Sequence, residues 1–124
     1  MAQANTETRS LARAALSLRC LPFRRGFYEA VEGRALSSED LARQADVTSA
    51  LTFFPLSSER AEDHFLWLIR LGVLRREVDG QGLTSRVRLT PMGRQVLRGW
   101  PSEIPRAGRR QRILEALRRH RPRL

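Results

Sequence analysis

The side chains that most often carry out catalysis or bind metal ions are scarce in this chain. It holds one cysteine, Cys20, and two histidines, His64 and His120, in 124 residues. These three residues lie far apart in the sequence and lack the spacing of a metal-binding cluster. Gly80 and Gly82 flank a single residue, which is too short for a dinucleotide-binding motif and is typical of a hairpin turn. We therefore expect a protein without enzymatic activity, metal ion or cofactor.

Structural roles account for these few residues. A lone cysteine cannot build a disulfide framework, so we expect Cys20 to pack as a small hydrophobic side chain in a reducing cytoplasm. His64 and His120 are expected to be solvated or to cap a helix end. No apolar run reaches the roughly 20 residues of a membrane span, and the start of the sequence lacks the pattern of a secretion signal. We therefore expect a cytoplasmic protein.

Arginine is the residue type that this chain holds in excess. All 23 basic residues are arginine, against 13 acidic residues, so the net charge is +10. Residues 1–97 carry +3 (14 arginines, 11 acids) and residues 98–124 carry +7 (9 arginines, 2 acids). This division predicts one domain over residues 1–97 and an Arg-rich tail over residues 98–124. The tail looks like poor core material, so a chain that ends near Gly99 should stay folded.

The stretch from Ser57 to Leu97 has the pattern of a helix, a two-stranded hairpin and a second helix. Ser57 is an N-cap candidate, and Gly72 is expected to end the first helix in the left-handed conformation. Apolar residues alternate on either side of the glycine turn, as in a hairpin. Thr90 and Pro91 should begin the second helix. We expect Phe65, Trp67 or Leu68 of the first helix to be buried.

Three further helices are expected before this stretch, over residues 6–20, residues 23–32 and the residues after Ser37. Ser37 and Asp40 have capping-box spacing, and residues 34–36 could form a short strand that pairs with the hairpin. About nine residues then separate Val47 from the next helix, more than the three or four of a DNA-reading helix pair.

Phe53 and Phe54 lie in this long connection. We expect them to fill the core beneath it, and the alternative is an exposed contact site for another protein. In the tail, residues 107–120 could form a short amphipathic helix that packs on something or forms on contact, with one apolar side made of Ile113, Leu114 and Leu117.

This order of elements resembles the winged-helix superfamily of bacterial regulators. The matching motifs are LA at residues 41–42, LGVL at residues 71–74 and LTPMG at residues 89–93. More narrowly, the chain is similar to a small uncharacterised family of photosynthetic bacteria over residues 12–97, through LRCLPF (18–23), GVLRREVDGQGLT (72–84) and RLTPMGR (88–94). The resemblance implies a bacterial cytoplasm and an α+β, mostly helical winged helix-turn-helix fold. It implies no established activity.

Nucleic acid is the partner that the basic residues favour. Candidate contacts lie in the hairpin and the tail: Arg75, Arg76, Arg86, Arg88, Arg109, Arg110 and Arg112. Alternation places Arg86 and Arg88 on one face of their strand, where they could meet phosphates. Pairing of these arginines with Glu77 and Asp79 in a solvated hairpin is an equally good interpretation.

One feature opposes base-specific reading of DNA. The second helix of a DNA-binding helix-turn-helix enters the major groove with its first residues, which here include Glu59, Glu62 and Asp63. We therefore expect a nucleic-acid-associated protein, DNA-binding or similar to a transcription regulator. The alternative is a protein-interaction module of a larger assembly, whose basic tail contacts RNA, an acidic partner or an anionic surface. Phe53, Phe54, Glu59, Glu62 and Asp63 would then make the protein contact, and the terminal helices could form a homodimer.

Overall fold

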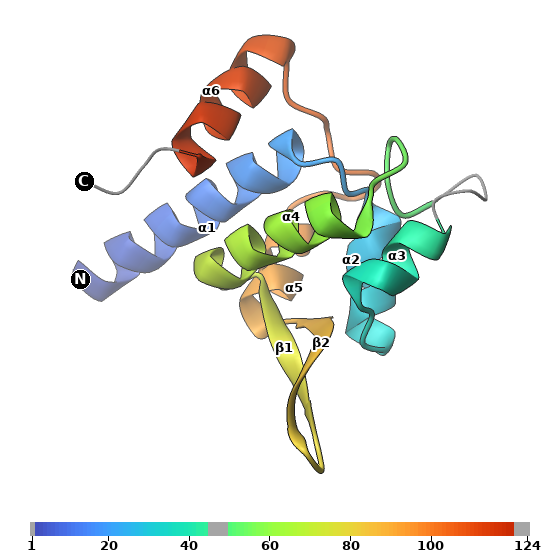
Figure 1. Cartoon of the computed structure of the whole chain (residues 1–124). Helices are drawn as coiled ribbons and strands as arrows, with labels where there is room; N and C mark the ends of the chain where they lie inside the picture. Colours follow the sequence, from blue (N-terminus) through green and yellow to red (C-terminus); the bar gives the residue numbers. More distant parts are fainter. Residues whose placement is uncertain (1, 45–49, 121–124) are drawn as a thin grey trace.

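The computed structural model describes residues 2–44 and 50–120. In this part of the chain, six helices and one antiparallel pair of strands form a mostly helical α+β fold (Figure 1). The elements are α1 (Ala2–Cys20), α2 (Arg25–Gly33), α3 (Ser38–Gln44), α4 (Ser58–Leu71), β1 (Leu74–Asp79), β2 (Gly82–Leu89), α5 (Pro91–Arg98) and α6 (Arg109–Arg119). The expected α+β class is confirmed, although α1 begins at Ala2 rather than at Thr6. Val47 lies outside the described residues.

Local capping signals set the ends of the central helices as the sequence predicts. The Ser57 hydroxyl accepts a hydrogen bond from the Arg60 backbone N–H at 3.2 Å, and Gly72 ends α4 with a φ of 85°. The Thr90 hydroxyl accepts from the Gly93 N–H at 3.0 Å at the start of α5. Because each cap satisfies backbone groups that a helix end leaves unpaired, these serine, glycine and threonine positions fix where the helices begin and end.

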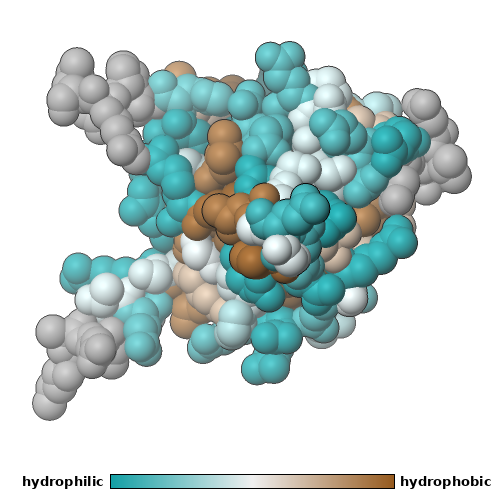
Figure 2. Space-filling view, turned by 60° about the horizontal axis from the view of Figure 1, so that its bottom comes forward, coloured by the Kyte–Doolittle hydropathy of each residue, from teal (hydrophilic) through white to brown (hydrophobic). Residues whose placement is uncertain are grey.

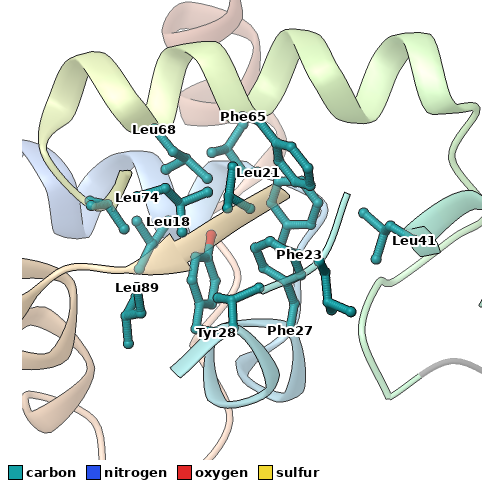
Figure 3. Packing of buried hydrophobic residues seen from close by; sticks show 14 of the residues in the cluster. Leu18, Leu21, Phe23, Phe27, Tyr28, Leu41, Phe65, Leu68, Leu74 and Leu89 are labelled. Carbon is teal, nitrogen blue, oxygen red and sulfur yellow. The ribbon is translucent and has the colours of Figure 1, made fainter. Parts of the chain in front are cut away.

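Stacked aromatic rings form the centre of the core (Figure 3). The ring centroids of Phe23 and Phe27 lie 4.4 Å apart, and Phe27 stacks on Phe65 of α4 at 5.6 Å. Tyr28 meets Phe27 edge to face at 5.1 Å. Aliphatic residues of α1, the segment that follows it, α3, α4 and the hairpin close around these rings, among them Leu18, Leu21, Leu41, Leu68, Leu74 and Leu89. The expected burial of Phe65 and Leu68 is confirmed.

The hairpin is joined to the helical body by a third, very short strand segment. β1 and β2 pair in register from Leu74 opposite Leu89, with an irregularity between Arg76 and Val78. Leu36, which precedes α3, exchanges two backbone hydrogen bonds with Val87 of β2, at 3.2 and 2.8 Å. The expected pairing of this segment with the hairpin is therefore confirmed.

The connection before α4 does not fill the core as expected. Phe53 and Phe54 are 37% and 48% exposed, and their rings contact the guanidinium groups of Arg24 and Arg106 rather than the core. The connection is instead tied to the segment between α1 and α2 through its backbone. The Phe53 N–H donates to the Pro22 carbonyl at 2.9 Å, and the Arg24 N–H donates to the Leu51 carbonyl at 2.8 Å.

The expectation that the segment after Leu97 is poor core material is wrong. Ile104 and Ala107 are buried, because the chain turns back along α1 after α5. The Ala107 N–H donates to the Arg19 carbonyl at 2.8 Å, and the Arg19 guanidinium donates to the Pro105 carbonyl at 2.9 Å. The high arginine content of this segment led the sequence analysis to overlook Ile104 and Ala107, two apolar residues that are buried.

Charged side chains near the start of α2 hold the same segment. The Arg25 guanidinium donates to the backbone carbonyls of Leu97, Trp100 and Ser102, at 3.2, 2.8 and 3.0 Å. Glu103 pairs with Arg24 at 2.7 Å and accepts the Arg25 backbone N–H at 2.8 Å. Burial alone would raise the pKa of Glu103, but these hydrogen bonds outweigh it and lower the pKa below its usual value.

Two leucines of α4 test the position of the core. Leu68 is fully buried, whereas Leu66, two residues earlier on the same helix, is 49% exposed. We expect Leu68→Ala to lower the free energy of unfolding by about 2–5 kcal/mol because it leaves a cavity. Leu66→Ala should change it by less than about 0.5 kcal/mol. Urea unfolding of both variants measures the difference, and equal losses would contradict the burial of this face.

Shortening the chain tests the role of the C-terminal segment. A chain that ends after Gly99 loses Ile104, whose burial contributes about 1.5–3 kcal/mol. It also loses the hydrogen bonds of Glu103 to Arg24 and to the Arg25 N–H, which partial exposure limits to about 1 kcal/mol each. We expect its free energy of unfolding to fall by about 3 kcal/mol or more.

Ile104→Ala and Ile113→Ala are the matched control for this shortening, since Ile104 is buried and Ile113 is 53% exposed. Thermal or urea unfolding should show a loss of about 2–5 kcal/mol for Ile104→Ala and almost none for Ile113→Ala. A shortened chain as stable as the whole would mean that residues 100–124 add nothing to the fold.

Candidate functional site

The hairpin presents arginines on its outer face. Val87 and Leu89 of β2 are buried, so Arg86 and Arg88 point to the opposite face, as alternation predicts. Arg75 of β1 lies directly opposite Arg88 in the register and therefore shares this face. The outer face thus combines Arg75, Arg86 and Arg88, and we use this name, the outer hairpin face, for these three residues.

Carboxylates partly neutralise the hairpin. Arg88 pairs with Glu77 on the neighbouring strand, and Arg86 lies 3.9 Å from Asp79. Pairing of hairpin arginines by these two acids therefore occurs, as one interpretation of the sequence held. Arg75 has no carboxylate partner among the residues that the structure describes.

Arg76 has a different role from its neighbours. It pairs with Glu62 of α4 and donates to the Ser85 carbonyl at 2.7 Å. It therefore fastens the hairpin to α4, on the side away from the outer hairpin face. Glu62 is consequently turned toward the hairpin, and Glu59 and Asp63 are the exposed acids at the start of α4.

The arginines of the C-terminal helix do not join the hairpin. Arg109 and Arg110 are exposed and Arg112 is half-buried, all on α6. Figure 1 shows α6 beside α1 at one end of the molecule and the hairpin at the other. The seven arginines predicted as nucleic-acid contacts therefore do not form one surface.

The hairpin end also exposes apolar side chains. Val78 and Leu83 face each other across the strands near the turn, and they are 60% and 76% exposed. Figure 2 brings this end of the molecule forward and shows hydrophobic surface surrounded by hydrophilic side chains. These two side chains lie at the turn, whereas Arg75 and Arg88 pair near the other end of the strands.

The exposed side of α4 borders an open hollow of about 620 Å³. Its lining combines acids (Glu59, Asp63), bases (Arg60, Arg70), Trp67 and the end of α6. The outward charges of α4 therefore nearly balance, and this surface is less acidic than the sequence suggested.

Sequence reasoning missed a buried polar network beneath this hollow. Glu115 of α6 is 5% exposed, and its carboxylate accepts from the Ser17 hydroxyl at 3.0 Å and lies 3.3 Å from the Arg119 guanidinium. The Trp67 indole N–H reaches the Ser17 oxygen at 3.2 Å, and Arg119 lies 3.5 Å from His64. The network joins α1, α4 and α6. The only signal in the sequence was that Glu115 is the sole acid in an otherwise basic helix.

The positions of the two histidines and the cysteine are explained by packing and by the end of a helix. His64 is half-buried and its ring lies perpendicular to that of Phe23, with ring centroids 5.8 Å apart, so the expectation of a solvated residue is wrong for it. His120 is exposed and follows the last turn of α6, where capping was expected. Cys20 is buried as expected, and burial raises the pKa of its thiol.

Phe53 and Phe54 form a second exposed feature. The guanidinium of Arg106 lies over both rings, 4.6 Å and 5.6 Å from their centroids, and that of Arg24 lies 5.5 Å from the Phe53 centroid. Such cation–π contacts lower the cost of exposing the rings.

Residues 2–44 and 50–120 hold no group of three or more His, Cys, Asp or Glu side chains that could bind a metal ion. None of their helices is long and apolar enough to cross a bilayer.

The fold and the outer hairpin face define a mostly helical α+β protein with an arginine-bearing hairpin. The Npun_F0494-like family matches residues 4–119, and the chain belongs to this family. The match agrees with the resemblance to a small uncharacterised family, and it extends beyond residues 12–97 to include α6. No curated protein and no solved structure matched the chain.

The pH dependence of stability tests the placement of His64. Burial, followed by the nearby Arg119 charge, lowers the pKa of His64 to about 4, whereas an unfolded chain titrates near pH 6.5. Between these values the unfolded chain binds a proton that the folded chain does not. Stability is therefore complete above about pH 6.5 and falls as the pH drops toward 4, by at most about 1.4 kcal/mol per pH unit.

Urea unfolding between pH 7 and pH 4 measures this effect against His64→Gln, which cannot titrate. Carboxylates also titrate over this range. The comparison therefore uses the difference in the free energy of unfolding between the wild type and His64→Gln at each pH. The wild type should lose stability faster than the variant as the pH falls, and parallel curves would place His64 in solvent.

Proposed function

We propose that the chain is a non-enzymatic winged-helix protein that associates with nucleic acid through the outer hairpin face. Support for the winged-helix arrangement comes from the order of elements: α2, the Leu36 segment, α3, α4 and then the hairpin. Leu36 pairs with β2, and α3 packs against α4. This is the arrangement that the motifs before and after the hairpin favour.

The observation that carries the nucleic-acid proposal is the cross-strand placement of Arg75 and Arg88. Like charges directly opposite each other destabilise an antiparallel sheet. Glu77 offsets only one of the two charges. A row of phosphates would neutralise the other, because guanidinium groups bind phosphate oxygens at close range. Arg86 adds a third charge to this face, and its 3.9 Å separation from Asp79 leaves that pairing weak.

Contacts of this kind position a protein on nucleic acid without reading bases. Glu59 and Asp63 lie exposed at the start of α4, where a base-reading helix would approach phosphates. Arg60 and Arg70 on the same helix balance the charges of these two acids and leave no net positive charge. We therefore infer association that is mainly electrostatic and similar for unrelated sequences.

Fluorescence anisotropy with two duplexes of unrelated sequence tests this proposal. Arg75→Gln with Arg88→Gln should weaken binding to both duplexes alike near 0.15 M salt. It should also reduce the slope of log affinity against log salt by about 0.9 for each phosphate that the variant no longer neutralises. The control is Arg9→Gln with Arg13→Gln, two exposed residues of α1 that remove the same charge away from the hairpin.

Two outcomes would contradict the proposal. Equal weakening by the hairpin and α1 variants would mean that the protein binds only as a +10 polycation. Absence of binding near 0.15 M salt would favour the second candidate function, a protein-interaction module. That candidate is supported by the exposed rings of Phe53 and Phe54, which a partner protein could cover.

A further inference from the structure

The helix α6 packs with its charged side inward and its apolar side outward. Glu115 is 5% exposed, and the Arg119 side chain next to it is 11% exposed. Ile113, Leu114 and Leu117 are 53%, 55% and 65% exposed. A surface helix normally turns its apolar residues to the core, so this orientation leaves an apolar face available to something outside the chain. We call these three residues the α6 stripe.

Specific contacts hold α6 in this orientation. The Ser17 hydroxyl donates to Glu115 at 3.0 Å, and the Cys20 thiol lies 3.8 Å from the Gln111 carbonyl. At the other end of the helix, Arg119 lies 3.5 Å from His64 of α4. Turning the stripe inward would break all three contacts and expose a buried ion pair. The outward direction of the stripe is therefore a fixed property of the fold.

The charges around the stripe indicate what covers it. Arg110 lies one helical turn before Ile113 and Leu114, Arg118 lies one turn after Leu114, and Arg109 is next to Arg110; all three arginines are exposed. Glu115, the only acid of α6, faces inward. An occupant must therefore be apolar and anionic at once. A second copy would bring arginines against arginines, and nucleic acid would leave the aliphatic side chains in water.

We propose that the α6 stripe lies on an anionic lipid surface, with Arg109, Arg110 and Arg118 contacting the head groups. Apolar residues on one side and arginines beside them are what a helix needs to lie in the plane of a membrane interface. Long arginine side chains can reach head groups while their stems cover apolar surface. Burial of the stripe and attraction between arginines and head groups are each modest alone. The helix therefore attaches only where the lipid is anionic.

The shape of this region favours a lipid surface over a protein partner. Figure 1 shows α6 as the outermost helix on its side of the molecule. The stripe holds no aromatic anchor, whereas protein interfaces depend on aromatic and arginine side chains seated in pockets. Three aliphatic side chains also cover far less than the roughly 800 Å² that each partner buries in a standard interface.

Vesicle sedimentation of the full-length protein tests the proposal. The vesicles contain phosphatidylglycerol and phosphatidylcholine in equal parts, or phosphatidylcholine alone. We expect binding to the anionic vesicles and little to the neutral ones. Ile113→Ser with Leu117→Ser keeps every charge and should lower the partition coefficient about tenfold or more. Both residues are exposed, and circular dichroism checks that the variant is folded.

The matched control is Val78→Ser with Leu83→Ser, which removes two exposed apolar side chains at the hairpin end. This variant should bind vesicles as the wild type does. Equal binding by the wild type and the α6 variant would mean charge adsorption only, and would overturn the proposal. So would absence of binding to anionic vesicles, or a dimer in solution that the α6 substitutions dissociate.

Discussion

The stacking of Phe23, Phe27 and Phe65 is the interaction on which the rest of the structure depends. Phe23 precedes α2, Phe27 belongs to α2 and Phe65 to α4, so these parts of the chain meet in one triangular cluster of rings. These three rings are fully buried, whereas Phe53 and Phe54 of the connection before α4 lie exposed. The hairpin and α1 then close the remaining sides (Figure 3).

Signals that act within a few residues could be predicted from the sequence. Ser57, Gly72 and Thr90 act on backbone groups of their own helix ends, so their roles follow from local order. The direction of α6 could not be predicted in this way. Its apolar side would face the core if the helix were considered alone, but Ser17 and His64, about 50 to 100 residues earlier, hold its charged side instead.

The candidate site also combines features that follow from local sequence with features that depend on contacts between distant residues. Alternation along β2 predicted that Arg86 and Arg88 share a face opposite Val87 and Leu89, and this depends only on strand geometry. The pairing of Arg76 with Glu62 depends on how the hairpin lies against α4, which no local pattern contains. The sequence therefore identified the basic hairpin, but it could not separate the arginines that hold the fold from those that face outward.

The contact between Glu103 and the first residue of α2 affects how the chain can fold during its synthesis. Arg24, the residue before α2, provides no side-chain cap, and the Arg25 N–H is bonded instead by a carboxylate 78 residues later. On a ribosome, α2 emerges long before the residue that completes its start. The backbone N–H at the start of α2 therefore acquires its partner only after residue 103 has left the exit tunnel, so the fold cannot be completed helix by helix from the N-terminus.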